Sequence, residues 1–220
     1  LDLYKSMKLP ELIERVSDIE GVEWIRLHYA YPLHFPVDLL RVMRERDNVC
    51  KYLDIALQHV SDDMLKKMRR NITKQKTIDL INQIGEEVPD IHIRTTMMVG
   101  HPGETEQDFQ EMIEFVKEMR FERLGAFPYS HEEGTYSDRH YGDDVPPSVK
   151  QERMNQLMEI QEGISLAVNE EKIGKTLRVI IDREEEDFFV GRTQYDSPEV
   201  DGEVLINKDS ELTVGQMYDV

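Results

Sequence analysis

The chain has 220 residues, of which 39% are hydrophobic and 33% charged, a composition typical of a soluble globular protein with room for one large domain or two small ones. Its formal net charge of −18 argues against a nonspecific nucleic-acid binder, because phosphate binding needs clustered lysine and arginine. No run approaches the roughly 18 apolar residues of a membrane span, and no secretory signal opens the chain, so we expect a cytosolic protein without a membrane partner.

The hydrophobic spacing of residues 12–129 alternates between that of helices and that of strands. It predicts helices over 12–19, 37–46, 61–68, 73–84 and 105–116, and strands over 24–29, 52–58, 91–99 and 121–129. Ser61, Thr73 and Thr105 are placed to cap three of these helices, and Val37 is expected to point inward from the second. Such alternation predicts parallel β/α units whose strand C-termini converge on one rim.

The most informative junction runs from Arg94 to Phe109, where an apolar strand meets a Gly-His-Pro-Gly turn and then a helix. Thr96 to Val99 has the unbroken apolar character of a strand covered on both faces. Gly100 and Gly103 let the backbone turn sharply and approach a ligand closely, which favours an enzyme because strand ends of this kind carry ligand sites. The alternative is that these residues only connect the strand to the helix and bind no ligand.

The second half of the chain has a different pattern. Residues 129–147 are polar and predict a loop, after which Pro146 opens a helix that extends to about Lys172. Short β-rich segments at 177–181, 188–193, 204–206 and 217–220, with a turn at Asp201-Gly202, predict a small antiparallel β-barrel of OB-like size. The last strand has no evident partner, so we expect this barrel to be incomplete.

We therefore divide the chain into a β/α domain over 1–145, a linker helix over 146–172 and a β-domain over 173–220. The first of these opens on a helix, so at least one preceding β/α unit is expected to be missing. From Thr176 to Val220 there are four basic residues against twelve acidic ones, a charge that would repel RNA and fits a basic protein partner. Simple solubility is the alternative explanation of this acidity.

Three segments resemble signatures of the radical-SAM methylthiotransferases: Leu53 to Arg70, Arg94 to Glu104, and Phe127 to Thr135. Gly191 to Thr193 and Ser197 to Gly202 are similar to the TRAM domain that these enzymes carry. The resemblance implies a partial radical-SAM (TIM-like) parallel β/α barrel followed by the small antiparallel TRAM barrel. Arg26 to Pro32, with Phe127 to Thr135, looks like the RimO branch, which modifies an aspartate of ribosomal protein S twelve. The sibling branch, tRNA methylthiotransferases, is the alternative.

The resemblance also implies cofactors, namely S-adenosyl-L-methionine (SAM) and two 4Fe-4S clusters. In the family, SAM yields a radical that takes hydrogen from the β-carbon of the target aspartate, and a methylthio group is delivered through the second cluster. Cysteines of a CxxxCxxC motif and of an N-terminal domain hold these clusters, and this chain has neither. Its single cysteine, Cys50, is expected to be a small buried hydrophobe placed before a strand. We therefore expect no metal ligands in these residues, and a chain that is inactive by itself.

Five residues are candidates for cofactor binding, and no catalytic residue can be named. Gln58 falls at the end of a strand, where its amide can face SAM, substrate or only a neighbouring loop. Met98 and Gly100 match the family position that meets adenine, although core packing is the default reading of Met98. Tyr129 follows the last barrel strand and belongs on the rim. Arg94 can pair with an anionic group, but lies at the strand's N-terminal end, where a core carboxylate such as Asp54 competes.

Other polar residues fall near the same rim. Arg69 and Arg70 end a helix, where they offset its dipole or reach a substrate carboxylate. Four histidines fall at or after predicted strand ends without a zinc-like spacing, and we interpret them as loop residues rather than ligands: His28, His59, His101 and His131. Three functions compete: a methylthiotransferase fragment acting on ribosomal protein S twelve, an acidic binding module for a basic ribosomal protein, and a scaffold without a cluster. We expect a monomer that does not act directly on nucleic acid.

Overall fold

The structure is a computed structural model that describes residues 4–209 and 211–220. The first domain contains, in chain order, α1 (Leu9–Ser17), β1 (Ile25–Ala30), α2 (Asp38–Glu45), β2 (Val49–Gln58), α3 (Asp62–Lys67), α4 (Lys74–Glu87), β3 (His92–Val99), α5 (Glu106–Met119), β4 (Arg123–Pro128) and α6 (Tyr136–His140). Helix α7 (Pro147–Glu170) leads to the second domain, which contains β5 (Arg178–Glu184), β6 (Phe188–Thr193), β7 (Val204–Asn207) and β8 (Met217–Asp219). No helix of the described residues is long and apolar enough to cross a membrane.

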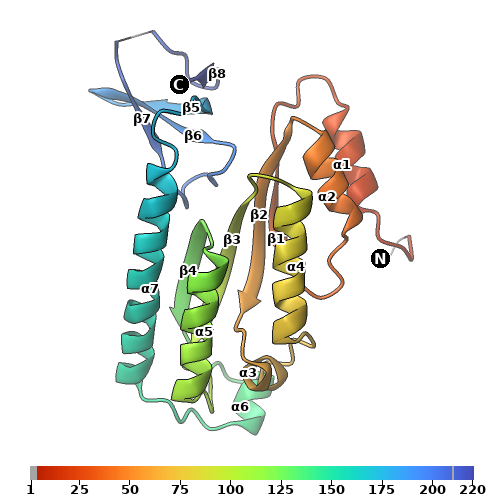
Figure 1. Ribbon diagram of the computed structural model, residues 1–220, viewed down its shortest axis with the longest axis vertical. Coiled ribbons are helices and arrows are strands. Elements are labelled where there is room, and N and C mark those ends of the chain that lie inside the picture. Colours follow the sequence, from red (N-terminus) through yellow and green to blue (C-terminus); the bar gives the residue numbers. More distant parts are fainter. Residues whose placement is uncertain (1–3, 210) are drawn as a thin grey trace.

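The four strands of the first domain form one parallel sheet in the order β1-β2-β3-β4 (Figure 1). Consecutive strands lie side by side, with Thr95 of β3 paired to Ile55 of β2 and to Leu124 of β4. Helices α4 and α5 lie against one face of the sheet and α7 packs beside β4. The predicted parallel β/α segment is confirmed, and its open four-stranded sheet is part of a TIM-like barrel rather than a closed one.

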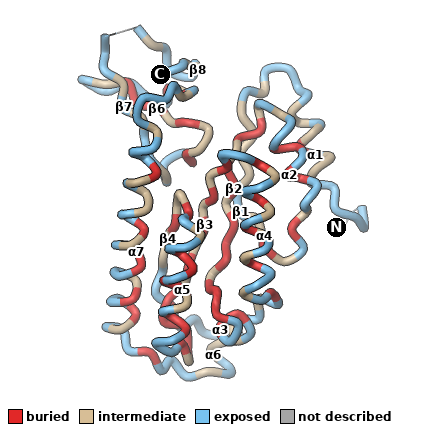
Figure 2. The backbone as a smooth tube through the Cα atoms, viewed as in Figure 1, coloured by how far each residue is buried: buried red, intermediate tan, exposed pale blue. Residues whose placement is uncertain are grey.

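The core lies between the sheet and these helices, where Figure 2 shows the buried backbone. The apolar stripe predicted for the fifth helix is confirmed, because Phe109, Met112, Ile113 and Val116 are all buried. Strand β3 differs from the prediction of a strand covered on both faces. Its buried residues alternate with half-buried ones such as Met98, because only the face toward the helices is covered by described residues.

The helix starts follow the predictions at Thr73 and Thr105 but not at Ser61. The Thr73 hydroxyl accepts from the Lys76 N–H, and Thr105 forms a capping box with Asp108. The Ser61 hydroxyl instead donates to the carboxylate of Asp108, and it does not cap α3. Val37 is also misassigned, because it precedes α2 and is 38% exposed.

The polar segment predicted as a loop over 129–147 contains one short helix, α6. Thr135 caps it by accepting from the Asp138 N–H, a local signal that the loop prediction overlooked. Helix α7 follows Pro146 as predicted and ends near the predicted residue.

The second domain is an antiparallel sheet in the order β7-β6-β5-β8. Its small core contains Val179, Ile181 and Phe189. The last strand was expected to lack a partner, but β8 pairs with β5, where Val179 lies opposite Tyr218. The acidic run Glu184 to Asp187 is exposed and extends from the last residue of β5 through the turn to β6.

The loop between β6 and β7, residues 194–203, lies against the N-terminal ends of the parallel strands, and we call it the docking loop. Every strand of the parallel sheet contributes a contact to it or to the end of β6. The Arg26 guanidinium donates to the Thr193 and Gln194 carbonyls, and the Lys51 N–H donates to the Gln194 side chain at 3.1 Å. The second domain is thus held at the N-terminal ends of the parallel strands, opposite their C-termini (Figure 1).

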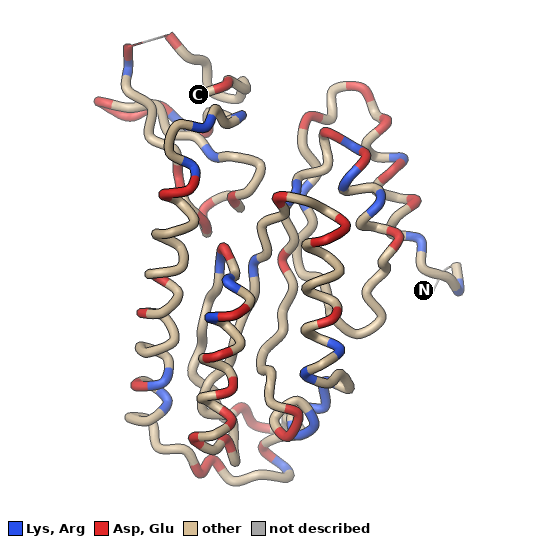
Figure 3. Tube along the Cα trace, viewed as in Figure 1, with Lys and Arg blue, Asp and Glu red and all other residues tan. Residues whose placement is uncertain are grey.

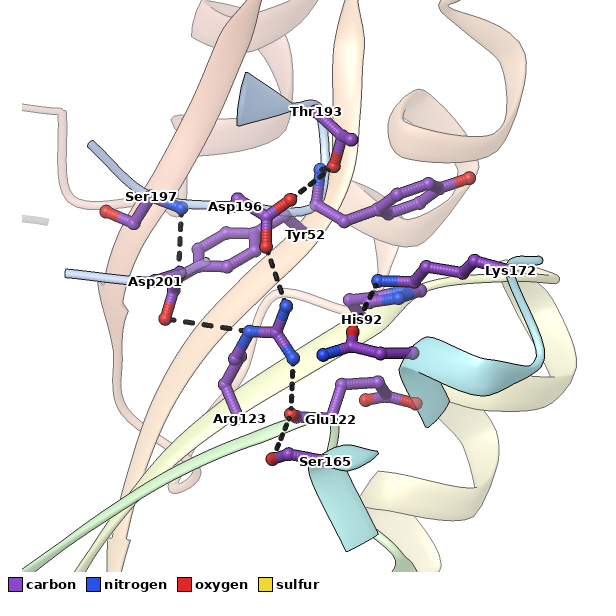
Figure 4. A network of polar contacts seen from close by, with 12 residues as sticks. Tyr52, His92, Glu122, Arg123, Ser165, Lys172, Thr193, Asp196, Ser197 and Asp201 are labelled. Carbon is purple, nitrogen blue, oxygen red and sulfur yellow. Dashed lines mark hydrogen bonds and ion pairs between the residues drawn. The ribbon is translucent and has the colours of Figure 1, made fainter. Parts of the chain in front are cut away.

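Two buried carboxylates anchor the docking loop (Figure 4). Asp201 accepts from the Tyr52 hydroxyl at 3.0 Å and from Arg94 at 2.5 Å, while Asp196 accepts from Arg123 at 2.7 Å. The Arg94 pairing differs from both sequence-based alternatives, an anionic ligand and Asp54. Asp201 was expected only to form a turn, and its side chain is instead 1% exposed.

His92, at the start of β3, stacks on Tyr195 of the docking loop with ring centroids 4.1 Å apart. Its Nδ1 lies 3.3 Å from the Asp90 carbonyl, a contact that fits a neutral ring donating from this nitrogen. Burial lowers the pKa of His92 to about 4, and Lys172 and Arg123 act in the same direction while the Asp90 carbonyl and Asp196 oppose it. The ring is therefore neutral at pH 7.

This pKa predicts that the chain becomes less stable as the pH falls from 6.5 to 4, because the unfolded state then takes up a proton at His92 that the folded state does not. The contribution lost over this window is about 3 kcal/mol. We expect the His92→Phe variant, which keeps a ring against Tyr195, to lose less stability than the wild type over the same range. Urea unfolding at several pH values measures the difference, and parallel curves would contradict the prediction.

Candidate functional site

The C-terminal ends of β2, β3 and β4 meet at the rim opposite the second domain, and they enclose a pocket of about 320 Å³. We call it the rim pocket; its lining residues are Gln58, Met68, Arg70, Met98, His101, Tyr129, Ser130, Glu132, Thr135 and Ser137. Its volume is in the range of small-molecule sites, and it combines apolar and polar groups. This is the edge at which parallel β/α enzymes place their ligands.

A larger cavity of about 700 Å³ lies elsewhere, between α7 and the docking loop. Its two arginines, Arg94 and Arg123, are already paired with Asp201 and Asp196. This cavity is therefore a product of domain docking, and the rim pocket is the better candidate for a functional site.

The structure brings together three of the five predicted site residues. Gln58, Met98 and Tyr129 come from the ends of three adjacent strands and line the rim pocket. Gly100 follows β3 directly and forms the turn behind it. Arg94 is not part of the group, because it lies four residues before Met98 on β3, about 13 Å away along the strand.

Gln58 has an uncommon backbone conformation, with a φ of 70°. The register between β2 and β3 shifts just before it, so the strand ends in a left-handed residue whose side chain faces the pocket. Strain of this kind is concentrated at ligand sites, where it holds a side chain in place.

We expect Gln58→Gly to be more stable than Gln58→Ala by about 1 kcal/mol, because glycine adopts a positive φ without steric cost. Urea unfolding of the two variants measures this difference. Both variants remove the amide, so a shared loss of ligand binding would come from the side chain and not from the backbone. Equal stability of the two variants would contradict the strain.

The Gly-His-Pro-Gly turn, residues 100–103, is fixed by a buried carboxylate. Gly100 and Gly103 have φ values of 73° and 74°. The Glu104 side chain accepts from the Gly100 N–H at 2.9 Å, and its other oxygen accepts from Arg153 of α7 at 2.7 Å. Buried His59 lies 3.4 Å from the same carboxylate. The turn is therefore rigid on the side away from the pocket.

His101 joins this turn to α6. Its Nδ1 lies 3.1 Å from the Pro102 carbonyl and its Nε2 lies 3.0 Å from the Ser137 hydroxyl. Because a carbonyl can only accept, the hydrogen in the first contact lies on Nδ1. Burial lowers the pKa of His101, which favours the neutral form of the ring.

Tyr129 belongs to a second chain of contacts at the rim. Its hydroxyl lies 3.1 Å from His131 Nδ1, and His131 Nε2 lies 3.1 Å from the carboxylate of Asp138 in α6. Burial raises the pKa of Tyr129, so the phenol stays protonated at neutral pH. The histidines interpreted as loop residues thus include two, His101 and His131, that orient groups of the pocket.

Arg70 brings a positive charge to the rim pocket. Its guanidinium lies over the Tyr31 ring at 4.4 Å and donates to the Ala56 carbonyl. Burial lowers its pKa, although an arginine remains charged at any physiological pH. Because Arg70 lines the rim pocket, its guanidinium is available to pair with a carboxylate bound there.

Lys150 and Arg153 are buried functional neighbours that the sequence did not reveal. Two cations three residues apart on a helix are usually a solvated pair, and their burial depends on which surface the helix covers. Cys50 is buried within β2 rather than before the strand, and it is the small buried residue that the sequence predicted. Residues 4–209 and 211–220 contain no group of three or more side chains arranged to hold a metal.

Comparisons with known proteins give a consistent assignment. Residues 6–116 match the model of the Radical SAM superfamily, and residues 173–220 match that of the TRAM domain. The chain is 70% identical over 220 residues to the ribosomal protein uS12 methylthiotransferase RimO of Parabacteroides distasonis, and 64% identical over 221 residues to that of Bacteroides thetaiotaomicron. All of this chain is covered in both alignments, but only 51% of each relative. The chain thus spans about half the length of these relatives.

A solved structure shares the fold. The radical SAM enzyme coproporphyrinogen III oxidase (HemN) of Escherichia coli matches 71% of this chain and 36% of its own, with a TM-score of 0.55 and 19% identity. At this identity the match concerns the fold alone.

Proposed function

This chain belongs to the radical SAM superfamily, and from this premise we propose that it is the rim-pocket and TRAM portion of a methylthiotransferase that modifies an aspartate of ribosomal protein S twelve. The observation that carries the proposal is 70% identity along all 220 residues to a relative named for that activity. The resemblance to the RimO branch at Arg26 to Pro32 points the same way.

The rim pocket is the proposed site of SAM. Its residues fit an adenosine linked to an amino acid, because Met98 and Tyr129 supply apolar and aromatic surface, Gln58 supplies an amide, and Arg70 supplies a cation for a carboxylate. Bound SAM would supply the radical that removes hydrogen from the target carbon. The part of this chain is to bind and orient the cofactor and to keep the turn behind it fixed.

The residues of this chain do not fit the iron-sulfur clusters. Its only cysteine is buried in β2, and the described residues offer no alternative set of metal ligands. We therefore propose that the cluster cysteines belong to a part of the enzyme outside these 220 residues. We expect this chain alone to be inactive.

The acidity of the TRAM domain supports a basic protein substrate over tRNA. Asp196 and Asp201 are used in docking, but Glu184 to Asp187 are exposed at the tip of the β5–β6 hairpin (Figure 3). A surface that binds RNA phosphates needs lysine and arginine instead. Ribosomal proteins carry such positive charge, and long-range attraction would favour their encounter with this surface. The proposed place of action is the cytoplasm.

The test uses the full-length enzyme that contains this chain, with reconstituted clusters, SAM and a sulfide source. It is incubated separately with ribosomal protein S twelve and with unmodified tRNA, and mass spectrometry detects the methylthio product. We expect modification of the aspartate only. Modification of tRNA with an unchanged protein would refute the substrate, and no methylthio product on either would refute the reaction.

A further inference from the structure

Helix α7 reaches the turn behind the rim pocket with two buried cations on one face, Lys150 and Arg153. Neither residue lines the pocket. Burying a cation costs free energy unless the cation is paired and hydrogen-bonded. The contacts of Lys150 and Arg153 therefore indicate their structural role.

Lys150 crosses directly over Gly100. A β-carbon added to Gly100 would lie 2.3 Å from the Lys150 γ-carbon, so the lysine stem occupies the space that the glycine leaves. The ammonium group then reaches the Asp143 carboxylate at 2.6 Å and the Tyr129 carbonyl at 3.3 Å. Lys150 thus touches the turn after β3 and the residue after β4 at the same time.

Arg153 lies one helical turn after Lys150 and contacts the C-terminal end of the loop formed by residues 100–104. Its guanidinium donates to the Glu104 carboxylate at 2.7 Å and to the Glu104 carbonyl at 3.3 Å, and it also reaches Glu106 at 3.3 Å. Glu104 in turn accepts from the Gly100 N–H. The arginine therefore fixes Gly100 through one intermediate side chain.

Helix α7 is itself hydrogen-bonded to the segment before β4, and these bonds restrict its movement. The Gln161 amide donates to the Phe121 carbonyl at 2.9 Å, and the Ser165 hydroxyl donates to the Glu122 carbonyl at 3.3 Å. The helix then continues to the TRAM domain (Figure 1). A displacement of the turn would have to move α7 or break these contacts.

We infer that Lys150 and Arg153 are positioning residues for the cofactor: they hold residues 100–104 in the shape that receives SAM, although neither lines the pocket. The inference rests on the proposed function. Small losses of position behind a site can cost on the order of a hundredfold in the function of that site.

The experiment measures SAM affinity by calorimetry on the full-length enzyme with reconstituted clusters. Lys150→Met keeps the stem over Gly100 and removes the ammonium, while Arg153→Lys keeps the charge and removes the two-pronged contact. We expect each to weaken SAM binding by on the order of tenfold or more. Gln151→Ala, an exposed change on the same helix, is the matched control and is expected to bind as the wild type does.

A second measurement separates positioning from general stability. Amide hydrogen exchange of Gly100 is expected to speed up in both variants while exchange in β2 stays unchanged. If the variants bind SAM as tightly as the wild type, the inference is wrong while the proposed function stands. If the wild type does not bind SAM, the proposed function itself fails. Equal acceleration throughout the barrel would mean a merely structural role and would also overturn the inference.

Discussion

Replacing Asp201 with alanine is expected to lower the free energy of unfolding by about 3 kcal/mol, because the change leaves the largely buried cation of Arg94 without its partner. The Arg94 side chain is 21% exposed, so water cannot fully replace the lost carboxylate, whereas Arg123 keeps its pair with Asp196. The Tyr52 hydroxyl and the Ser197 N–H lose their acceptor as well. Urea unfolding of this chain, followed by circular dichroism, measures the change.

The matched control is Asp187→Ala, which removes the same charge from the exposed β5–β6 turn. We expect it to change stability by less than about 0.5 kcal/mol. The double variant Asp201→Ala with Arg94→Met should recover part of the loss, because it removes the cation that Asp201→Ala leaves unpaired. A loss for Asp201→Ala no greater than that of the control would show that the docking loop is not anchored by this carboxylate.

The docking loop also shows where sequence patterns stop being informative. Arg94 and Asp201 are separated by 107 positions, and each has a plausible local interpretation, as the start of a strand and as a turn residue. Hydrophobic spacing records which face of an element is covered but not which loop from another domain covers an end. Predicting this pair would have required knowing that the TRAM domain lies at the N-terminal edge of the sheet.

The rim pocket was more predictable because it depends on local rules. Parallel strands end at the same edge, so Gln58, Met98 and Tyr129 were expected together once their strands were recognised. The same rule explains why Arg94 is not among them. Arg94 precedes Met98 on the same strand and therefore lies near the N-terminal end of β3, away from the rim pocket. Helix α6 was missed because its five residues carry no apolar stripe, although Thr135 and Asp138 form a recognisable cap.

The buried cations Lys150 and Arg153 could not be predicted at all. They are buried because α7 lies across the turn after β3. This is a tertiary contact, and no periodic pattern of hydrophobic residues in the sequence indicates it. Gly100 indicates part of this arrangement, because a glycine at this position lets another group approach the backbone closely. This approach was interpreted as an approach to a ligand, and the structure adds that a lysine stem lies against it on the other side.

Gly100→Ala is therefore expected to be strongly destabilising, by about 3 kcal/mol, from two additive costs. An alanine at a φ of 73° costs roughly 1 to 2 kcal/mol, and forcing its methyl group against the Lys150 stem adds an overpacking cost of about 1 to 3 kcal/mol. The lysine cannot simply move aside, because the contact is with its γ-carbon and its ammonium is held by Asp143.

Gly103→Ala provides the comparison that separates these costs. Gly103 has nearly the same φ, but its added β-carbon would meet the flexible end of Lys67, which can shift. We expect it to lose only the conformational cost, roughly 1 to 2 kcal/mol. Gly163→Ala, in the open middle of α7, should instead gain about 1 kcal/mol, because alanine is the better helix former. If the Gly100 and Gly103 variants unfold with equal free energies, Lys150 does not pack against the turn, and α7 cannot support it in the way described.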